Sequence, residues 1–228
     1  MVTNVKIIIW DFDGTFYPQN KAVTAAMEEK QYETIMRLKG WNRARAKEEF
    51  WKVYPMRTTS GNTAVGIVCG ITTAQAAVEN EKEFDRFAFM EKDSKLSELF
   101  AKLKKYRHFI LGNGVKENLV RTAKGLGILE FFEEIVTSEI VGANKPDPAG
   151  FLYIMKKTGL PAQNHLMVGD REVVDLAPAK VLGMQTCLVT WGGGFVELPK
   201  TGAFVDVSIP TIYDLPNVLP VVTVIPTQ

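Results

Sequence analysis

The chain of 228 residues is long enough to bury a substantial core, and it fits one domain with an insert or two small domains. Its hydrophobic share of 46% and charged share of 23% are ordinary for a globular protein, and 27 basic side chains nearly balance 26 acidic ones. This balance excludes the strongly basic composition that favours nucleic acid or an anionic membrane, so we expect neither partner.

Cysteine usage and hydropathy bear on where the protein works. Cys69 and Cys187 are the only cysteines and lack CxxC spacing, so we expect neither a disulfide scaffold nor a zinc-finger site. No apolar stretch approaches the roughly 20 residues of a membrane-spanning helix, and the first residues lack the apolar core of a secretory leader. We therefore expect a cytoplasmic protein. Its oligomeric state stays open between a monomer and a homodimer.

The first predicted element is a strand. Val5–Trp10 is apolar without alternation, which is the pattern of a strand buried on both faces of a parallel sheet. It is followed by Asp11 and Asp13, then by Gly14 and Thr15. Each carboxylate raises the cost of ionising the other. Such a pair makes sense where a divalent cation offsets part of the charge and the two carboxylates have different duties.

The next segment, from Phe16 to Asp93, is rich in charge, helical in period and without a convincing strand. We therefore assign 16–93 to a helical cap domain, and 1–15 together with 94–228 to a core domain. Within the insert, the loop Tyr54–Thr63 combines Arg57 with several hydroxyl groups. Arg57 is therefore a candidate substrate contact.

After the insert, strand and helix patterns alternate. Further apolar runs predict strands at His108–Leu111, Glu134–Thr137, Leu166–Val168, Thr186–Thr190 and Phe204–Val207. Helical patterns lie between the later runs, over 115–126, 148–158 and 173–182. They are followed by Gly127, Gly159 and Gly183, where a left-handed residue commonly ends a helix. This alternation predicts an open α/β sheet.

Polar stretches follow several of the predicted strands. They are Asp11–Thr15, Gly112–Gly114, Lys145–Pro148, and Gly169–Asp170 with Asp175 five residues on. In open α/β sheets, ligands bind at the carboxyl ends of the strands. We therefore expect these stretches to converge on one site although they lie far apart along the chain.

The order and spacing of these stretches resemble the haloacid dehalogenase superfamily, specifically its aspartate-dependent phosphatases. The sequence DFDGT over 11–15 resembles the first motif of that family, Lys145 the third, and GDREVVD over 169–175 the fourth. The resemblance covers essentially the whole chain, because the helical insert lies where the family carries a C1-type cap. It implies a Rossmann-like parallel sheet core with an inserted α-helical cap.

The resemblance also implies roles for these residues, in Mg²⁺-dependent hydrolysis of a small phosphomonoester. Asp11 would be the nucleophile that forms an aspartyl-phosphate, and Asp13 would protonate the leaving oxygen and then activate water. The Asp11 carboxylate, the backbone carbonyl of Asp13 and Asp170 would supply hard oxygen ligands for Mg²⁺. Asp175 would hold a metal-bound water or orient Lys145, and Lys145 would offset negative charge on the nucleophile and the phosphoryl oxygens.

The second aspartate separates two branches of this family. Dehalogenation expels halide, which needs no proton. Phosphoester cleavage releases an alkoxide, for which a general acid contributes about 10²–10⁴-fold. Asp13 therefore favours phosphoryl transfer.

The second motif departs from the family pattern. It normally presents a Ser or Thr hydroxyl to the phosphoryl group, but Gly112 stands there. The backbone N–H groups of Gly112 and Asn113 remain candidate substrate contacts. If neither the backbone nor Asn113 compensates, the loss of one donor to the transition state costs on the order of 10²–10³ in rate.

Two alternatives to a phosphatase stay open. A phosphosugar mutase of the same superfamily shares the carboxylate pair and differs in transferring the phosphoryl group. A catalytically weakened phosphate- or metal-binding protein would explain Gly112. A signalling receiver domain also phosphorylates an aspartate, but it has no large helical insert and orders its motifs differently.

The two histidines, His108 and His165, precede predicted strands. Their spacing does not suggest a ligand pair. We expect both at the surface or at a sheet edge.

Overall fold

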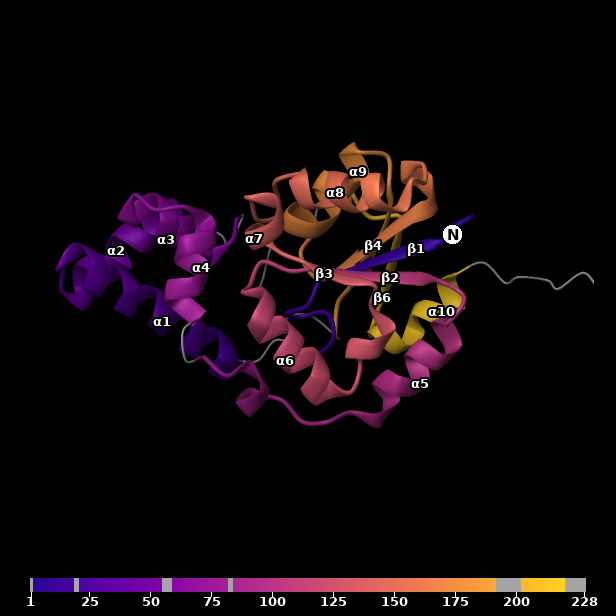
Figure 1. The fold of residues 1–228 in the computed structure, drawn as a ribbon, viewed down its shortest axis with the longest axis horizontal. Coiled ribbons are helices and arrows are strands. Elements are labelled where there is room, and N and C mark those ends of the chain that lie inside the picture. The colour runs from indigo at the N-terminus through magenta and orange to yellow at the C-terminus, as the bar shows by residue number, and fades with distance from the viewer. Residues whose placement is uncertain (1, 19–20, 55–58, 82–83, 192–201, 220–228) are drawn as a thin grey trace, which may run out of the picture.

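The computed structural model describes residues 2–18, 21–54, 59–81, 84–191 and 202–219. At its centre lies a parallel sheet of six strands in the order β3-β2-β1-β4-β5-β6 (Figure 1). The strands are β1 (Ile7–Trp10), β2 (Arg107–Leu111), β3 (Glu134–Val136), β4 (His165–Gly169), β5 (Gln185–Val189) and β6 (Val207–Ile209). Successive strands run outward in one direction from β1 and in the other from β4. Ligands of open α/β sheets bind at such a switch point.

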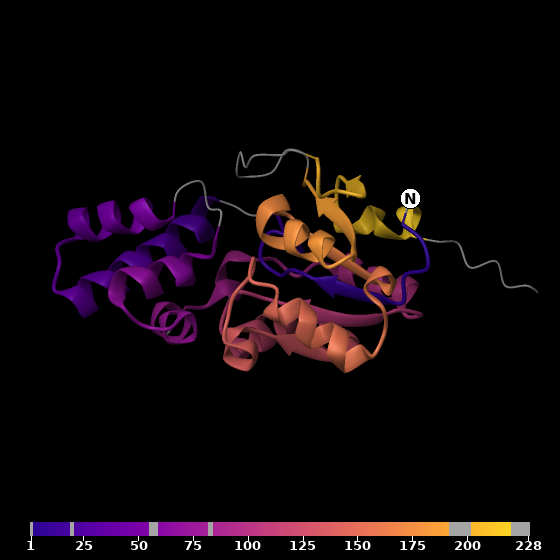
Figure 2. The same cartoon turned by 90° about the horizontal axis from the view of Figure 1, so that it is seen from above.

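The strands are apolar because helices cover both faces of the sheet (Figure 2). In β1, Ile8 packs on one face and its neighbours Ile7 and Ile9 pack on the other. The first face is covered by α5 (Ser94–Leu103), α6 (Lys116–Leu126) and α10 (Leu215–Val218), and the second by α8 (Ala149–Thr158) and α9 (Ala177–Val181). The short helix α7 (Ser138–Val141) follows β3. The predicted α/β fold with a parallel sheet is confirmed.

Four helices form a separate lobe beside the sheet (Figure 1). This helical lobe consists of α1 (Lys21–Lys39), α2 (Arg43–Val53), α3 (Gly61–Cys69) and α4 (Thr73–Glu81). It has a core of its own, in which Tyr32, Ile35 and Phe50 are buried. These helices fall within the segment predicted as a cap. The assignment of 16–93 to one domain stays a prediction.

The later elements agree with the sequence except at two places. The predicted strand Phe204–Val207 is shifted, since β6 runs over Val207–Ile209. The predicted helix over 173–182 is a π-helical turn, Glu172–Leu176, that continues into α9. All three glycines predicted to end helices have positive φ, at 71°, 67° and 87°.

The expectation that both histidines lie at the surface or at a sheet edge is wrong, since both are buried in interior strands of the sheet. His108 begins the apolar part of β2 and is 4% exposed, and His165, the first residue of β4, is fully buried. Trp10 Nε1 donates to His108 Nδ1 (3.1 Å), and the other ring nitrogen lies 3.1 Å from the Leu103 carbonyl. Burial lowers the pKa of His108 to about 4. The ring is therefore a neutral, hydrogen-bonded part of the core.

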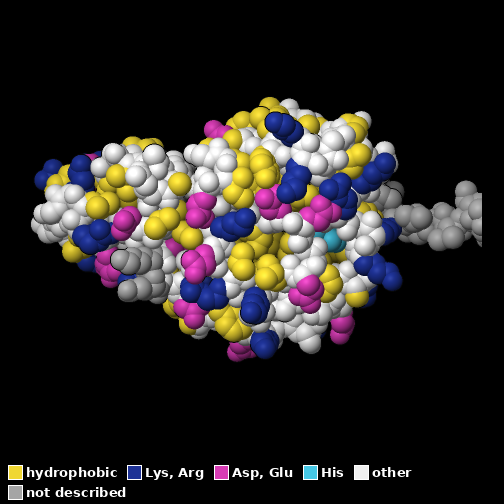
Figure 3. Space-filling view, in the orientation of Figure 1, with side chains coloured by type: hydrophobic (Ala, Val, Ile, Leu, Met, Phe, Trp, Pro, Cys, Tyr) yellow, Lys and Arg dark blue, Asp and Glu magenta, His cyan; other side chains and the backbone are white. Residues whose placement is uncertain are grey.

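The surface carries charges of both signs. Figure 3 shows basic and acidic side chains interspersed across the helical lobe and the sheet domain on the face it presents. Within the described ranges, no helix combines the length and the apolar character needed to cross a membrane.

Candidate active site

The polar stretches predicted from the sequence meet at the end of the sheet that faces the helical lobe. Asp11 and Asp13 follow β1, Asn113 follows β2, and Asp170 follows β4. A cavity of about 120 Å³ opens beside them. Core residues Asp11, Asp13, Asn113 and Arg171 line it together with Gln31, Tyr54 and Asn62 of the helical lobe.

Asp11 is held by its backbone N–H and by both oxygens of its carboxylate. Its N–H donates to the Val168 carbonyl (2.9 Å), which extends the pairing of β1 with β4 by one residue. Its Oδ1 accepts from Lys145 Nζ (2.5 Å), and its Oδ2 accepts from Thr15 Oγ1 (3.0 Å). The carboxylate is thus fixed in direction beside a cation, as a nucleophile must be.

Lys145 lies fully inside the protein between two carboxylates. Its Nζ also pairs with Asp175 Oδ1 at 2.8 Å. Burial works against the charge, but the attraction of Asp11 and Asp175 outweighs it and raises the pKa of Lys145 above its ordinary value. Lys145 is therefore a cation at neutral pH.

Asn113 fixes the backbone that carries this lysine. Its Oδ1 accepts the Lys145 N–H (2.8 Å), and its Nδ2 donates to the Lys145 carbonyl (3.0 Å). The side-chain amide is thus engaged with the protein. The backbone carbonyl of Asn113 accepts from Asn62 Nδ2 (2.9 Å), which ties this loop to the helical lobe.

Three carboxylates could hold a metal. One oxygen from each of Asp11, Asp170 and Asp175 lies within 4.8 Å of the others. Burial, followed by repulsion from Asp11 and Asp175, raises the pKa of Asp170 well above its ordinary value. A buried group of hard oxygen donors with this excess of negative charge fits Mg²⁺. Gly169 is required beside them, since a Cβ there would lie 2.6 Å from the Asp175 Cβ.

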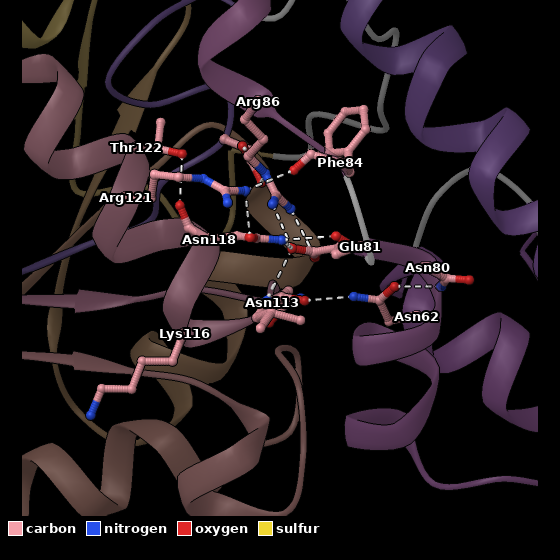
Figure 4. Close-up of polar contacts among 12 residues, drawn as sticks. Asn62, Asn80, Glu81, Phe84, Arg86, Asn113, Lys116, Asn118, Arg121 and Thr122 are labelled. Carbon is pink, nitrogen blue, oxygen red and sulfur yellow. Dashed lines mark hydrogen bonds and ion pairs between the residues drawn. The ribbon is translucent and has the colours of Figure 1, made fainter.

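Asp13 has a different set of partners. The Tyr17 hydroxyl donates to its Oδ1, and Arg86 Nε lies 3.2 Å and 3.3 Å from its two oxygens. Arg86 in turn forms a two-pronged ion pair with Glu81 at the end of α4 (Figure 4). Sequence reasoning missed both Arg86 and Glu81. The available signal was an arginine inside the aromatic run FDRFAF over 84–89, where a charge needs a partner.

The comparisons with known proteins decide the family. The family model of haloacid dehalogenase-like hydrolases matches residues 5–183, which is most of the chain. The chain belongs to the haloacid dehalogenase-like hydrolases. The predicted family is therefore confirmed, and the chain is an enzyme of that family.

Among the relatives of this hydrolase are phosphatases of small metabolites. A glyceraldehyde 3-phosphate phosphatase of Methanocaldococcus jannaschii is 43% identical over 76 residues, which cover 33% of this chain and 32% of that protein. A phosphoglycolate phosphatase of Pectobacterium atrosepticum is 25% identical over 224 residues, or 90% of each chain. The solved structure of a haloacid dehalogenase phosphatase from Thermococcus onnurineus has a similar fold, with a TM-score of 0.64 at 21% identity over 93% of this chain and 97% of that one.

Gly112 is where this hydrolase departs from the family pattern. Its N–H donates to the Val136 carbonyl (3.0 Å), so this amide is engaged with the neighbouring strand. A Cβ at this position would lie 2.4 Å from Leu119 Cδ1, so a side chain from α6 already fills that space. Gly112 and Asn113 as substrate contacts stay predictions, and Arg57 lies outside the described residues.

Arg171 is a further cavity residue that sequence reasoning missed. Its backbone N–H donates to Asp175 Oδ2 (3.0 Å), and its Nη1 donates to the Thr59 carbonyl of the helical lobe (3.3 Å). The residue directly after Asp170 therefore connects the carboxylate cluster to the lobe. Its position inside the fourth motif was the signal that could have found it.

Proposed function

We propose that this hydrolase cleaves a small phosphomonoester in a Mg²⁺-dependent reaction that passes through a phosphorylated Asp11. The observation that carries the proposal is the placement of the Asp11 carboxylate at the cavity, between Lys145 and the other acids. The phosphatase relatives and the limited size of the cavity support a small substrate.

In the first step, an oxygen of Asp11 attacks phosphorus and the bond from phosphorus to the leaving oxygen breaks. Asp13 gives its proton to that oxygen, so the product leaves as an alcohol. In the second step, water attacks phosphorus and gives a proton to the Asp13 carboxylate. The bond to Asp11 then breaks, which releases phosphate and restores both aspartates.

The surrounding residues support these steps. Lys145 offsets negative charge on Asp11, and Thr15 fixes the second oxygen of the same carboxylate. The Asp11 and Asp170 carboxylates and the backbone carbonyl of Asp13 would hold Mg²⁺, which when bound offsets charge on the phosphoryl oxygens. The contact between Asp175 and Lys145 supports the orienting role of Asp175.

The test is the variant Asp11→Asn, measured as phosphate release from p-nitrophenyl phosphate and a panel of sugar phosphates and nucleotides with Mg²⁺. We expect turnover to fall by at least about 10³-fold, because the nucleophile is lost. Asp206→Asn is the matched control, since Asp206 pairs with Lys180 and does not line the cavity. Full activity of Asp11→Asn would contradict the proposal.

A catalytically weakened binding protein is the second candidate. The engaged Gly112 amide and the Leu119 side chain in place of a hydroxyl favour it. A loss of about 10²–10³ in rate is expected for one missing donor. Tight, Mg²⁺-dependent binding of a phosphate ester without turnover would select this candidate.

A further inference from the structure

Arg86 is a buried charge outside the carboxylate cluster. It lies in the connector between α4 and α5, in the 3-10 turn Arg86–Phe89, and is 1% exposed. A guanidinium is costly to bury unless its charge and its donors are paired. Its partners therefore indicate what keeps it there.

The guanidinium joins two carboxylates from different parts of the molecule. Nη1 and Nη2 donate to the two oxygens of Glu81, at 2.5 Å and 2.9 Å. On its other edge, Nε lies within hydrogen-bonding distance of both oxygens of Asp13. Asp13 remains 27% exposed, and Arg86 and Glu81 line the cavity beside it. Arg86 therefore holds the carboxylate at the cavity wall and leaves it open to the cavity.

The core residues that follow β2 fix the position of the Arg86–Glu81 ion pair. Glu81 Oε2 also accepts from Asn118 Nδ2 in α6 (3.2 Å; Figure 4). The same oxygen accepts from the N–H of Val115, the residue before α6 (3.1 Å). A Cβ at Gly114 would lie 2.9 Å from Arg86 Nη2 and 3.0 Å from Glu81 Oε1. Any other residue at Gly114 would therefore displace the pair. The absence of a side chain at Gly114 leaves the space that the Arg86–Glu81 pair occupies.

We propose that Arg86 is a positioning residue for Asp13, held in place by Glu81, and that it supports the step in which Asp13 takes a proton from water. The inference rests on the proposed function. A guanidinium that donates to both oxygens restricts rotation of the carboxylate and compensates its charge beside the negative Asp11. Tyr17 restrains the same group from its Oδ1 side.

A purely structural role, as a clamp between helical lobe and core, is the competing explanation. Arg121 provides the comparison, because its Nη2 donates to the Phe84 carbonyl of the same connector (3.2 Å) and to Asn118 Oδ1 (2.7 Å). Neither of these contacts involves Asp13. Arg121→Gln therefore weakens the clamp and leaves the Asp13 pairing in place.

The experiment compares pre-steady-state turnover of p-nitrophenyl phosphate with Mg²⁺ in the full-length wild type, Arg86→Gln and Arg121→Gln. Nitrophenolate leaves without a proton, so the first turnover needs no acid, whereas hydrolysis of the phosphorylated Asp11 needs Asp13 as base. For Arg86→Gln we expect a retained burst followed by steady-state turnover about 10–100-fold slower than wild type. Arg121→Gln should stay within about threefold of wild type in both phases.

A second variant keeps the test decisive if Arg86→Gln does not fold. The double variant Glu81→Gln with Arg86→Gln replaces the ion pair by an amide pair that can still hydrogen-bond. It removes the cation from Asp13, so we expect the same retained burst and slow steady state. Equal loss in both phases, or turnover like that of Arg121→Gln, would overturn the proposal.

A crystallographic readout separates this proposal from the proposed function. If Asp11→Asn keeps full activity, or the wild type releases no phosphate, the proposed function fails. Crystal structures of the double variant and of Arg121→Gln still test the positioning role. We expect Asp13 to lose its orientation only in the double variant, and an unchanged Asp13 there would overturn the inference.

Discussion

Asp11 and Asp13 are two positions apart in sequence, yet they belong to two differently built halves of the active site. Asp11 is 4% exposed, and its carboxylate is bound by Lys145 and Thr15, both from the core. Asp13 is more open, and it is bound by Tyr17 and by Arg86 from the connector between α4 and α5. Each carboxylate has its own cation.

This difference explains how two carboxylates can lie side by side at the end of an apolar strand. Repulsion between them would be costly in a site of low polarity. Lys145 offsets the charge of Asp11, and Arg86 offsets the charge of Asp13. Asp11 therefore stays fixed as the proposed nucleophile, while the Asp13 carboxylate faces the cavity. The core alone supplies the residues that bind Asp11, whereas the binding of Asp13 also needs the connector between α4 and α5.

The largest expected effect tests the Asp11 half. Replacing Lys145 by Met leaves Asp11 and Asp175 without the cation that they share beside Asp170. We expect the free energy of unfolding, measured with urea in EDTA, to fall by about 3–5 kcal/mol. Lys157→Met is the control, since its surface pair with Glu134 should be worth only about 0–1 kcal/mol. Similar losses in the two variants would show that Lys145 does not hold the cluster together.

Magnesium should act on the same half. If Mg²⁺ binds the folded state only, a Mg²⁺ concentration one hundred times Kd raises the free energy of unfolding by about 2.7 kcal/mol. This corresponds to a rise in Tm of about 5–10 °C. Asp170→Asn should abolish this rise, because it removes one of the three clustered carboxylates, while Asp206→Asn should keep it. A full Mg²⁺ response in Asp170→Asn would remove Asp170 from the metal site.

The smallest expected effect concerns the Asp13 half. Tyr17→Phe removes one donor to Asp13 but leaves Arg86 in place, so we expect turnover to fall only about tenfold. Burial, and then the charge of Asp13, raise the pKa of Tyr17 well above its ordinary value of 10. The hydroxyl therefore keeps its proton as pH rises, and the ratio of wild-type to variant turnover should be constant between about pH 6 and pH 9.

A matched control sharpens this measurement. The Tyr153 hydroxyl donates to Glu134 Oε1 (3.2 Å) outside the cavity lining, so Tyr153→Phe should leave turnover unchanged. A ratio for Tyr17→Phe that changes tenfold across the pH range would mean that the phenol itself titrates there.

Much of the fold could be predicted from local sequence patterns. The apolar run at β1, the helix over 116–126 and its terminal Gly127 were recognisable because burial and helix ends depend on neighbouring residues. The prediction for the two histidines was wrong because it also used neighbouring residues only. A polar ring at the start of a strand looks like a surface residue until its partners, such as Trp10 for His108, are known.

The active site also has features that local sequence patterns reveal and features that they do not. The sequence by itself determined the family, the α/β class and the candidate residues Asp11, Asp13, Lys145 and Asp170, because each motif is short. Asp11, Asp13 and Asp170 follow strands directly, whereas Lys145 lies in the loop after α7. Only the tertiary structure decided that Asn113 clamps Lys145, that Leu119 fills the space beside Gly112, and that Arg86 pairs with Asp13. Hydrophobic periodicity and motifs are local, whereas the pairing of residues 73 positions apart depends on how the whole chain packs.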